Sequence, residues 1–258
     1  MSDVGVLDKV MAVLRCFPDG SSPIEPRALA ARLGMPPATA YRLTKAMAEH
    51  GLLEAEGSGY RLGVTLLHLG ARVADGLEVR QVARPHLEWL RDQTQENAEL
   101  HLRHGSSRVP VEVLHSRLNL RPVGQVGVPF PLHVGASAKV LLAWLEPDES
   151  EALVRASLSA YDGQHELDVD QMRRRLADVR VRGWAFTDGE REVGVASVAA
   201  PVRDRFGVVV AALVLAGPSS RLSQPEARET GARLTTEAAG RISRALGHLD
   251  ESTTTGES

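Results

Sequence analysis

The chain has 258 residues, 43% hydrophobic and 24% charged, which is ordinary for a soluble protein of one or two domains. The single cysteine, Cys16, excludes an internal disulfide and a cysteine-clustered zinc site, and the net charge of −3 gives no overall nucleic-acid signature. No apolar run reaches the ~18 residues of a membrane span, and the N-terminus lacks a hydrophobic block, so we expect a cytoplasmic protein without signal peptide or membrane partner.

The N-terminal quarter of the chain predicts three helices followed by a two-stranded hairpin. An apolar stripe predicts a helix over residues 6–17, and "PRALAARLG" begins with a proline and ends on Gly34, a helix stop. The next segment, "PPATAYRLTKAMAEH", also has prolines in its first turn, where a missing N–H costs nothing. A turn at residues 56–59 then predicts the hairpin. This order indicates a winged helix-turn-helix.

The third of these helices has a polar face that a core helix does not need. Ala40, Leu43 and Met47 have the spacing of a core stripe, and Tyr41 lies off that stripe. Residues 26–48 hold four basic residues and no acid. Because a helix fits the DNA major groove and its N-terminal side chains reach base edges, we predict that this surface binds DNA. The predicted contacts are Arg27, Thr39, Tyr41, Arg42, Lys45 and, at the hairpin tip, Ser58.

The rest of the chain predicts a sheet flanked by helices. Residues 64–76 predict a helix without a core of its own, which we interpret as a linker. A second helix is predicted over 78–97, with a break or a new start at Pro85. Strands are predicted at 98–104, 108–115, 184–190, 195–204 and 208–217, and helices at 135–145, 146–158, 168–183 and 225–249.

Several ordered motifs make the chain resemble the IclR family of bacterial transcription regulators along nearly its whole length. They include "LAARLGMPPATAYRLTKAMAEHGLLE", "PLHVGASAKVLLAWL", "EREVGVASVAAPV" and "VVAALVLAGPSSRLS". The resemblance implies an α+β two-domain protein that binds a double-stranded DNA operator and a small-molecule effector, without a cofactor, as a repressor or activator. It also implies a homodimer formed through the DNA-binding domains, often paired into a homotetramer.

The resemblance and the composition together predict the domain boundaries. Residues 1–63 form the winged helix-turn-helix, 64–78 the linker helix and 79–249 a GAF-like α/β effector-binding domain, followed by a disordered tail, 250–258. One departure concerns the recognition helix, which in the family commonly opens with Lys-Ser and here has Pro37-Ala38. Fewer contacts from the start of that helix are therefore expected.

The resemblance also implies an effector site over the sheet. A loop at the start of a helix presents backbone N–H groups that suit a carboxylate, and an acidic loop lies across the pocket. Val214 and Ala216 replace residues that are often serine, so we expect an organic acid with an apolar or aromatic body, unless both side chains point into the core. The implied residues are His133, Gly135, Ala136, Ser137, Thr187, Asp188, Glu190, Ser197, Val214 and Ala216.

Other functions fit the sequence less well. Ser137 and Lys139 form a Ser-x-Lys pair, but two residues apart on a helix they do not face each other, and no hydrolase elbow, P-loop or Rossmann motif is present. We therefore predict that the chain is not an enzyme. His101 and His104 are expected on opposite sides of a strand, unable to share a metal, and His115 either lines the pocket or lies elsewhere. A winged helix that binds a protein instead of DNA remains an alternative.

Overall fold

The computed structural model describes residues 5–17, 23–161 and 168–249. The chain divides into two compact units, Met1–Gly76 and Leu77–Ser258. The predicted disordered tail lies outside the described residues. Among the helices in the described ranges, none combines the length and the hydropathy that a membrane span requires.

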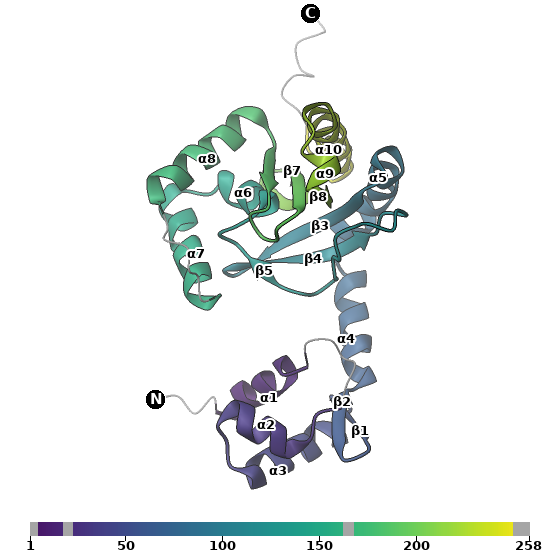
Figure 1. Cartoon of the computed structure of the whole chain (residues 1–258), viewed down its shortest axis with the longest axis vertical. Coiled ribbons are helices and arrows are strands. Elements are labelled where there is room, and N and C mark those ends of the chain that lie inside the picture. The colour runs from purple at the N-terminus through teal and green to yellow at the C-terminus, as the bar shows by residue number, and fades with distance from the viewer. Residues whose placement is uncertain (1–4, 18–22, 162–167, 250–258) are drawn as a thin grey trace, which may run out of the picture. The chain divides into compact units, whose positions relative to one another are not determined.

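The first unit has the predicted order of three helices and a hairpin (Figure 1). Gly34 ends the second helix in the left-handed conformation, with φ of 61°, and its N–H donates to the carbonyl of Ala30. The predicted winged helix-turn-helix is therefore confirmed. The elements are α1 (Gly5–Arg15), α2 (Pro26–Leu33), α3 (Pro37–Glu49), β1 (Leu53–Glu56), β2 (Gly59–Leu62) and α4 (Val64–Asp75).

A small apolar core joins α2 and α3 to the hairpin. Leu29, Met47 and Leu53 are almost fully buried in it, and burying such a side chain contributes roughly 1.5–3 kcal/mol. Ala40 is also fully buried, whereas Leu43 is half-buried. Because α3 turns this stripe toward the core, the opposite face of the helix is exposed to solvent.

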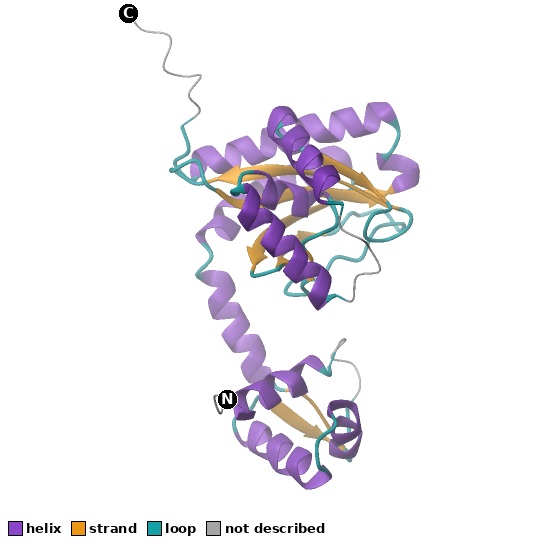
Figure 2. Cartoon of the chain, turned by 90° about the vertical axis from the view of Figure 1, so that its left-hand side faces the viewer, coloured by secondary structure: helices purple, strands orange, loops and turns teal. Residues whose placement is uncertain are grey.

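The second unit is a sheet with helices on both faces, as predicted (Figures 1 and 2). Within the described residues the strands form one antiparallel sheet in the order β5-β4-β3-β8-β7-β6. The strands are β3 (Asn97–His104), β4 (Ser107–Leu114), β5 (Phe130–Pro131), β6 (Ala185–Asp188), β7 (Val195–Arg203) and β8 (Val209–Pro218). The helices are α5 (Glu78–Thr94), α6 (Ala136–Ala143), α7 (Pro147–Ala160), α8 (Val169–Arg182), α9 (Ser219–Leu222) and α10 (Pro225–Ala245).

The two faces of the sheet have separate cores. Leu213 and Leu215 of β8 belong to one apolar cluster with side chains of α5 and with Ile242 of α10. On the other face, Ala212 packs in a second cluster with Val140 of α6 and residues of α7 and α8. Successive residues of a strand point to opposite faces, so β8 contributes to both cores. The face covered by α6 also carries the cavity described below.

The prediction of a helix break at Pro85 was wrong. The helix α5 runs unbroken through this position. Proline removes a hydrogen bond from a helix interior at a cost of about 3 kcal/mol. However, Ala83, Leu87 and Leu90 of the same helix are completely buried against the sheet and α10. Their burial outweighs that cost, so the helix continues.

Candidate functional site

The solvent-facing side of α3 carries the polar side chains predicted to contact DNA. Tyr41 is 59% exposed, Arg42 and Lys45 are also exposed, and Thr39 is half-buried. Arg27, near the start of α2, borders the same shallow surface depression as Tyr41 and Arg42. Within the described ranges no carboxylate pairs with Arg42 or Lys45. Their charges are therefore available to a phosphate backbone.

Ser58 has a partner within the protein. Its hydroxyl donates to Oε1 of Glu25 at 2.6 Å, which ties the hairpin tip to the start of α2. The carboxylate of Glu25 places a negative charge beside the tip. Of the predicted DNA contacts, Ser58 is consequently the one whose surroundings suit a phosphate least.

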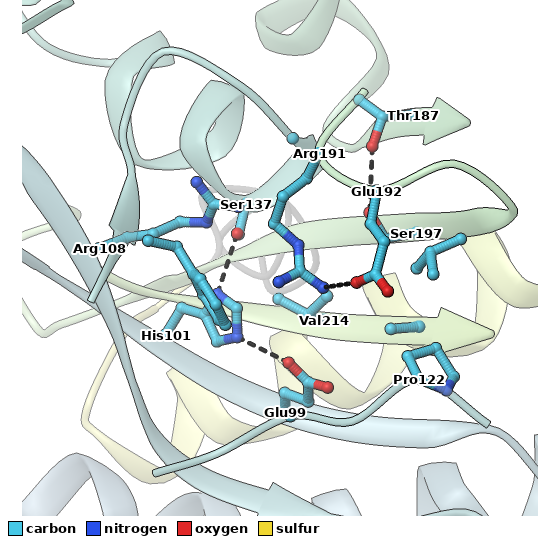
Figure 3. Close-up of a pocket in the computed structure, with 15 residues that line it drawn as sticks. Glu99, His101, Arg108, Pro122, Ser137, Thr187, Arg191, Glu192, Ser197 and Val214 are labelled. Carbon is cyan, nitrogen blue, oxygen red and sulfur yellow. Dashed lines mark hydrogen bonds and ion pairs between the residues drawn. The ribbon is translucent and has the colours of Figure 1, made fainter. Parts of the chain in front are cut away.

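The second candidate site is a cavity on the α6 face of the sheet (Figure 3). Its walls come from β3, β4 and β8, from the start of α6, and from the segment between β6 and β7. Its volume is about 40 Å³, room for roughly three water molecules. Six residues predicted for the effector site line it: Gly135, Ser137, Thr187, Ser197, Val214 and Ala216.

Strand alternation places the apolar part of this lining. Val214 and Ala216 lie on the α6 face of β8 and border the cavity. Ser197 of β7 pairs with Ala216 in the sheet and lies beside it, and its hydroxyl is 3.1 Å from that of Thr187. Phe130 adds an aromatic ring to the lining. The cavity therefore has an apolar wall, with the two hydroxyls bonded to each other.

A buried chain of three polar residues forms another wall (Figure 3). Oγ of Ser137 lies 3.0 Å from Nδ1 of His101, and Nε2 of His101 lies 2.8 Å from Oε2 of Glu99. All three residues are at most 5% exposed. Burial lowers the pKa of His101, an effect that the hydrogen bond to Glu99 only partly offsets. The imidazole is therefore neutral near pH 7.

Glu99 stays ionised despite its burial. Burial alone would raise its pKa, but the hydrogen bond from His101 comes first among the causes that hold the pKa below its usual value, followed by the contact with Asn97 and the charge of Arg191. Nδ2 of Asn97 lies 3.4 Å from the other carboxylate oxygen, Oε1. Among the described residues Oε1 thus has only this long contact, and it belongs to a residue that lines the cavity.

Arg108 reaches the cavity because β4 contains a β-bulge. The pairing of β3 with β4 skips Val111, which is an extra residue in β4. Glu112, beyond the bulge, pairs with arginines of α5, whereas Arg108 lies on the α6 face. Without the bulge, residues four apart on a strand would share a face. The bulge therefore turns Arg108 toward the cavity.

Arg108 is a buried cation without a carboxylate contact in the described part of the chain. It is 3% exposed. Its Nη1 donates to the carbonyls of Pro131 and Val134, and its Nε has no partner. Burial, and next the charge of Arg191, lower the pKa of Arg108 to about 9. The charges of Glu99 and Glu190 oppose this lowering without contacting the guanidinium. A buried charge without a contacting counter-charge is costly, so an anion that reaches Arg108 would stabilise it.

A second arginine lies across the cavity mouth. Arg191 is on the exposed segment between β6 and β7, with its guanidinium 4.4 Å from the ring centre of Phe130. It pairs at 3.3 Å with Glu192, the next residue (Figure 3). The guanidinium of Arg108 lies 5.5 Å from the same ring centre. Two cations and one aromatic ring thus meet at this end of the cavity.

Four of the predicted effector residues do not line this cavity. Ala136 is buried in the core under α6, because the first helical turn directs it inward. Asp188 points away and accepts hydrogen bonds from Ser219 and Ser223. His133 and Glu190 lie beside a neighbouring depression between α6, α7 and α8.

Glu190 occupies the place in which the sequence suggested the acid group of an effector. Its Oε2 accepts a hydrogen bond from the backbone N–H of Gly135, at 3.0 Å, and pairs with Lys139. Burial would raise the pKa of Glu190, but Lys139 and the Gly135 N–H hold it below its usual value. The N–H of Gly135, at the start of α6, is thus already bonded to a carboxylate of the protein. An anion in the cavity would therefore be bound by the arginines.

Sequence analysis missed the ionisable residues that line the cavity, Glu99, His101, Arg108, Arg191 and Glu192. His101 and His104 do lie on different sides, since His101 is buried and His104 exposed, and His115 is exposed outside the cavity. The apolar-polar alternation of β3 offered a usable signal for Glu99 and His101, whose neighbours Ala98 and Leu100 face the other core. The sequence offered no such signal for Arg108, because the apolar-polar alternation of β4 does not reveal the position of a bulge.

Two known family models match the chain and together cover most of it. The model for the bacterial transcriptional regulator IclR C-terminal matches residues 71–244, and the model for the IclR helix-turn-helix domain matches residues 6–57. The chain is 32% identical over 225 residues to the HTH-type transcriptional regulator KdgR of Escherichia coli, covering 86% of this chain and 85% of that protein.

Two further relatives extend the similarity over nearly the full length. The glycerol operon regulatory protein of Streptomyces coelicolor is 30% identical and covers 93% of this chain, with 96% of its own length matched. The crystal structure of an IclR homolog from Microbacterium hydrocarbonoxydans, complexed with 4-hydroxybenzoate, superposes with a TM-score of 0.78 at 28% identity. That match covers 94% of this chain and 99% of the other.

Proposed function

The chain belongs to the IclR family of bacterial transcriptional regulators, and from this premise we propose that an organic acid bound in the cavity changes its affinity for an operator. The observation that carries the proposal is Arg108, a buried cation on the cavity wall without a carboxylate contact among the described residues. An anionic ligand supplies the missing charge, and a charge-assisted hydrogen bond to Nε is worth more than a neutral one.

The body of this acid is apolar or aromatic. Phe130, Val214 and Ala216 line the cavity, and the hydroxyls of Ser197 and Thr187 bond to each other. A cavity volume of about 40 Å³ is too small for an aromatic acid. Arg191, whose side chain lies over Phe130 on an exposed segment, is the group that moves to admit it. The neighbour bound to 4-hydroxybenzoate is a family member that holds a ligand of this class.

The DNA contacts are made by the exposed face of α3 and its surroundings. Arg42 pairs with a guanine or a phosphate, Thr39 and Tyr41 contact bases or phosphates, and Arg27 and Lys45 contact the backbone. These are the polar side chains that the core of the first unit leaves outside. Since the net charge is −3, non-specific binding is weak and specific binding depends on few contacts.

The protein acts as a homodimer, alone or paired into a homotetramer. Exposed apolar side chains on α1 and α4 support an interface in the first unit: Val6, Leu7, Met11, Val64, Leu67, Leu69 and Val73. Such exposure over two helices is typical of an interaction surface. A dimer places two α3 helices in successive major grooves of a near-palindromic operator.

Fluorescence-anisotropy titration of the purified full chain against DNA from upstream of its own gene tests the proposal. We expect salt-sensitive binding that exceeds binding to a scrambled duplex and that Arg42→Ala abolishes. Arg173→Ala is the matched control, because Arg173 lies on α8 of the second unit and pairs with Glu151. Equal binding to both duplexes would argue for another operator, which sequencing of genomic fragments retained by the protein would locate, or, if none is retained, for a protein partner.

A further inference from the structure

We infer that the effector is a hydroxy acid, whose carboxylate is bound by Arg108 and whose hydroxyl donates a hydrogen bond to Ser137 or Glu99. The inference rests on the proposed function, since it concerns the ligand of the same cavity. It adds a second recognition element, one that separates hydroxy acids from plain acids and keto acids. The argument depends on the direction of the hydrogen bonds in the buried chain.

Each hydrogen bond in the chain from Glu99 to Ser137 has a fixed direction. An ionised carboxylate can only accept, so Nε2 of His101, at 2.8 Å from Glu99, carries the proton. In a neutral imidazole the other nitrogen, Nδ1, is then an acceptor. Nδ1 lies 3.0 Å from Oγ of Ser137, so the serine hydroxyl donates to it. Ser137 therefore has only oxygen lone pairs left to offer a ligand.

Glu99 provides a second acceptor on the same wall. Its Oε2 is occupied by His101, and its Oε1 has only the 3.4 Å contact with Nδ2 of Asn97. Glu99, His101 and Ser137 all line the cavity. This wall thus presents acceptors and no free donor.

The arginine wall has the opposite character. Nε of Arg108 is a buried donor without a partner in the described part of the chain, and the guanidinium of Arg191 lies over the same aromatic ring as that of Arg108. A carboxylate, which only accepts, fits these donors.

A ligand that satisfies both sets of groups carries an anion for the arginines and a hydrogen-bond donor for the acceptors. An acid without a hydroxyl group removes water from the oxygens of Ser137 and Glu99 and offers no donor in its place. A keto or methoxy acid brings an oxygen lone pair close to these oxygens, and the lone pairs repel each other. A buried polar group left without its partner weakens binding by about 10- to 100-fold. An amino acid offers a donor, but its ammonium group has a larger hydration shell to lose. A hydroxyl group fits this wall at the lowest desolvation cost.

Isothermal titration calorimetry with the full-length protein tests this with matched acids. The aromatic set is 4-hydroxybenzoate, benzoate and 4-methoxybenzoate, and the aliphatic set is lactate, propionate, pyruvate and alanine. We expect a hydroxy acid in at least one set to bind about 10- to 100-fold tighter than its unsubstituted, methoxy or keto partner. We also expect it to bind tighter than the amino compound.

The variants connect the preference to the residues. Ser137→Ala should reduce the preference, because the serine oxygen is lost, although Nδ1 of His101, then unpaired, and Oε1 of Glu99 remain as acceptors. Ser243→Ala is the matched control, because Ser243 is also 3% exposed but lies on α10, over the other face of the sheet. It should keep the preference of the unaltered protein. Arg108→Met should weaken the hydroxy acid and its plain partner equally.

The possible results separate this inference from the proposed function. If plain, keto or amino acids bind as tightly as hydroxy acids, the hydroxy-acid inference fails and the organic-acid effector stands. A preference that survives Ser137→Ala undiminished would also overturn the inference. If no acid binds while the protein still binds its operator, the inference and the organic-acid effector both fail.

Discussion

At the scale of single residues, two buried charged side chains of β4 differ in whether an opposite charge contacts them. Glu112 is 4% exposed and contacts two arginines of α5, Arg80 and Arg84, each at 2.6 Å. Arg108 is as deeply buried, but its Nη1 donates to carbonyl groups, and no carboxylate of the described residues contacts it. A charge that is buried with its partner is compensated within the fold, whereas one buried beside a cavity without a contacting partner suits a ligand. The contrast supports the assignment of Arg108 to the effector.

The buried histidine should make stability depend on pH. Burial lowers the pKa of His101 below the value of about 6.5 that it has in the unfolded chain. As the pH falls through about 6.5, the unfolded chain binds a proton that the folded chain does not, so stability falls until the folded pKa is passed. We expect urea unfolding to show this decline and His101→Gln, which stays neutral, to flatten it.

His86 must be controlled in that experiment. Burial, with the charges of Arg241 and Arg244, also lowers its pKa, so His86 acts in the same pH window and in the same direction. His86→Asn should remove a smaller part of the decline, because His86 is only half-buried whereas His101 is 4% exposed. An unchanged decline in His101→Gln would contradict a buried, neutral His101.

The ion pair of Glu190 and Lys139 should show strong coupling. The side chain of Lys139 is 14% exposed and that of Glu190 is 28% exposed, and Glu190 also accepts from the Gly135 N–H. Glu190→Gln leaves the ammonium with little solvent and no carboxylate, so we expect a loss of about 1–3 kcal/mol in the free energy of unfolding.

A double-mutant cycle provides the check. Replacing the lysine as well, in Glu190→Gln with Lys139→Met, should recover part of the lost stability, because no unpaired charge remains. Additive losses measured by urea unfolding would show that the two side chains do not stabilise each other.

At the scale of elements, the sequence predicted the helices and strands whose causes lie within a few residues of each other. The helices and hairpin of the first unit follow from prolines, Gly34 and apolar spacing, all of which act within a few residues. The sheet and its flanking helices also follow, and so does the position of Val214 in the lining of the cavity. The bulge at Val111 and the continuity of α5 through Pro85 depend on tertiary packing, which a local pattern does not contain.

The continuity of α5 gives an element-scale prediction. Pro85 is exposed in the interior of the helix, where it removes one backbone donor. Pro85→Ala restores that donor and improves helix propensity, so we expect an increase of about 1–3 kcal/mol in the free energy of unfolding. Thermal and urea unfolding measure it, with Gln93→Ala, at an exposed position of the same helix, as the comparison. A destabilised Pro85→Ala would show that the proline ring makes a contact more valuable than the hydrogen bond.

At the scale of the whole molecule, the exposed apolar side chains of the first unit predict self-association. Leu67 of α4 is 73% exposed. Leu67→Glu places a charge in the proposed interface, so we expect light scattering after gel filtration to show a lower mass and operator binding to weaken. Val181→Glu, on α8 at a position 87% exposed, is the control and should keep the mass of the unaltered protein. The same mass for both variants would exclude Leu67 from the interface.

The central claim is that the acid in the cavity and the DNA on α3 are coupled. Coupled sites typically change each other's affinity by about 5- to 150-fold. The most direct measurement is the anisotropy of a labelled operator fragment titrated with the protein, with and without an acid that calorimetry has shown to bind. We expect the acid to shift the apparent Kd by about fivefold or more and the ratio of the two Kd values to fall to about one in Arg108→Met, which cannot hold the acid. A bound acid that leaves the Kd of the unaltered protein unchanged would contradict the account.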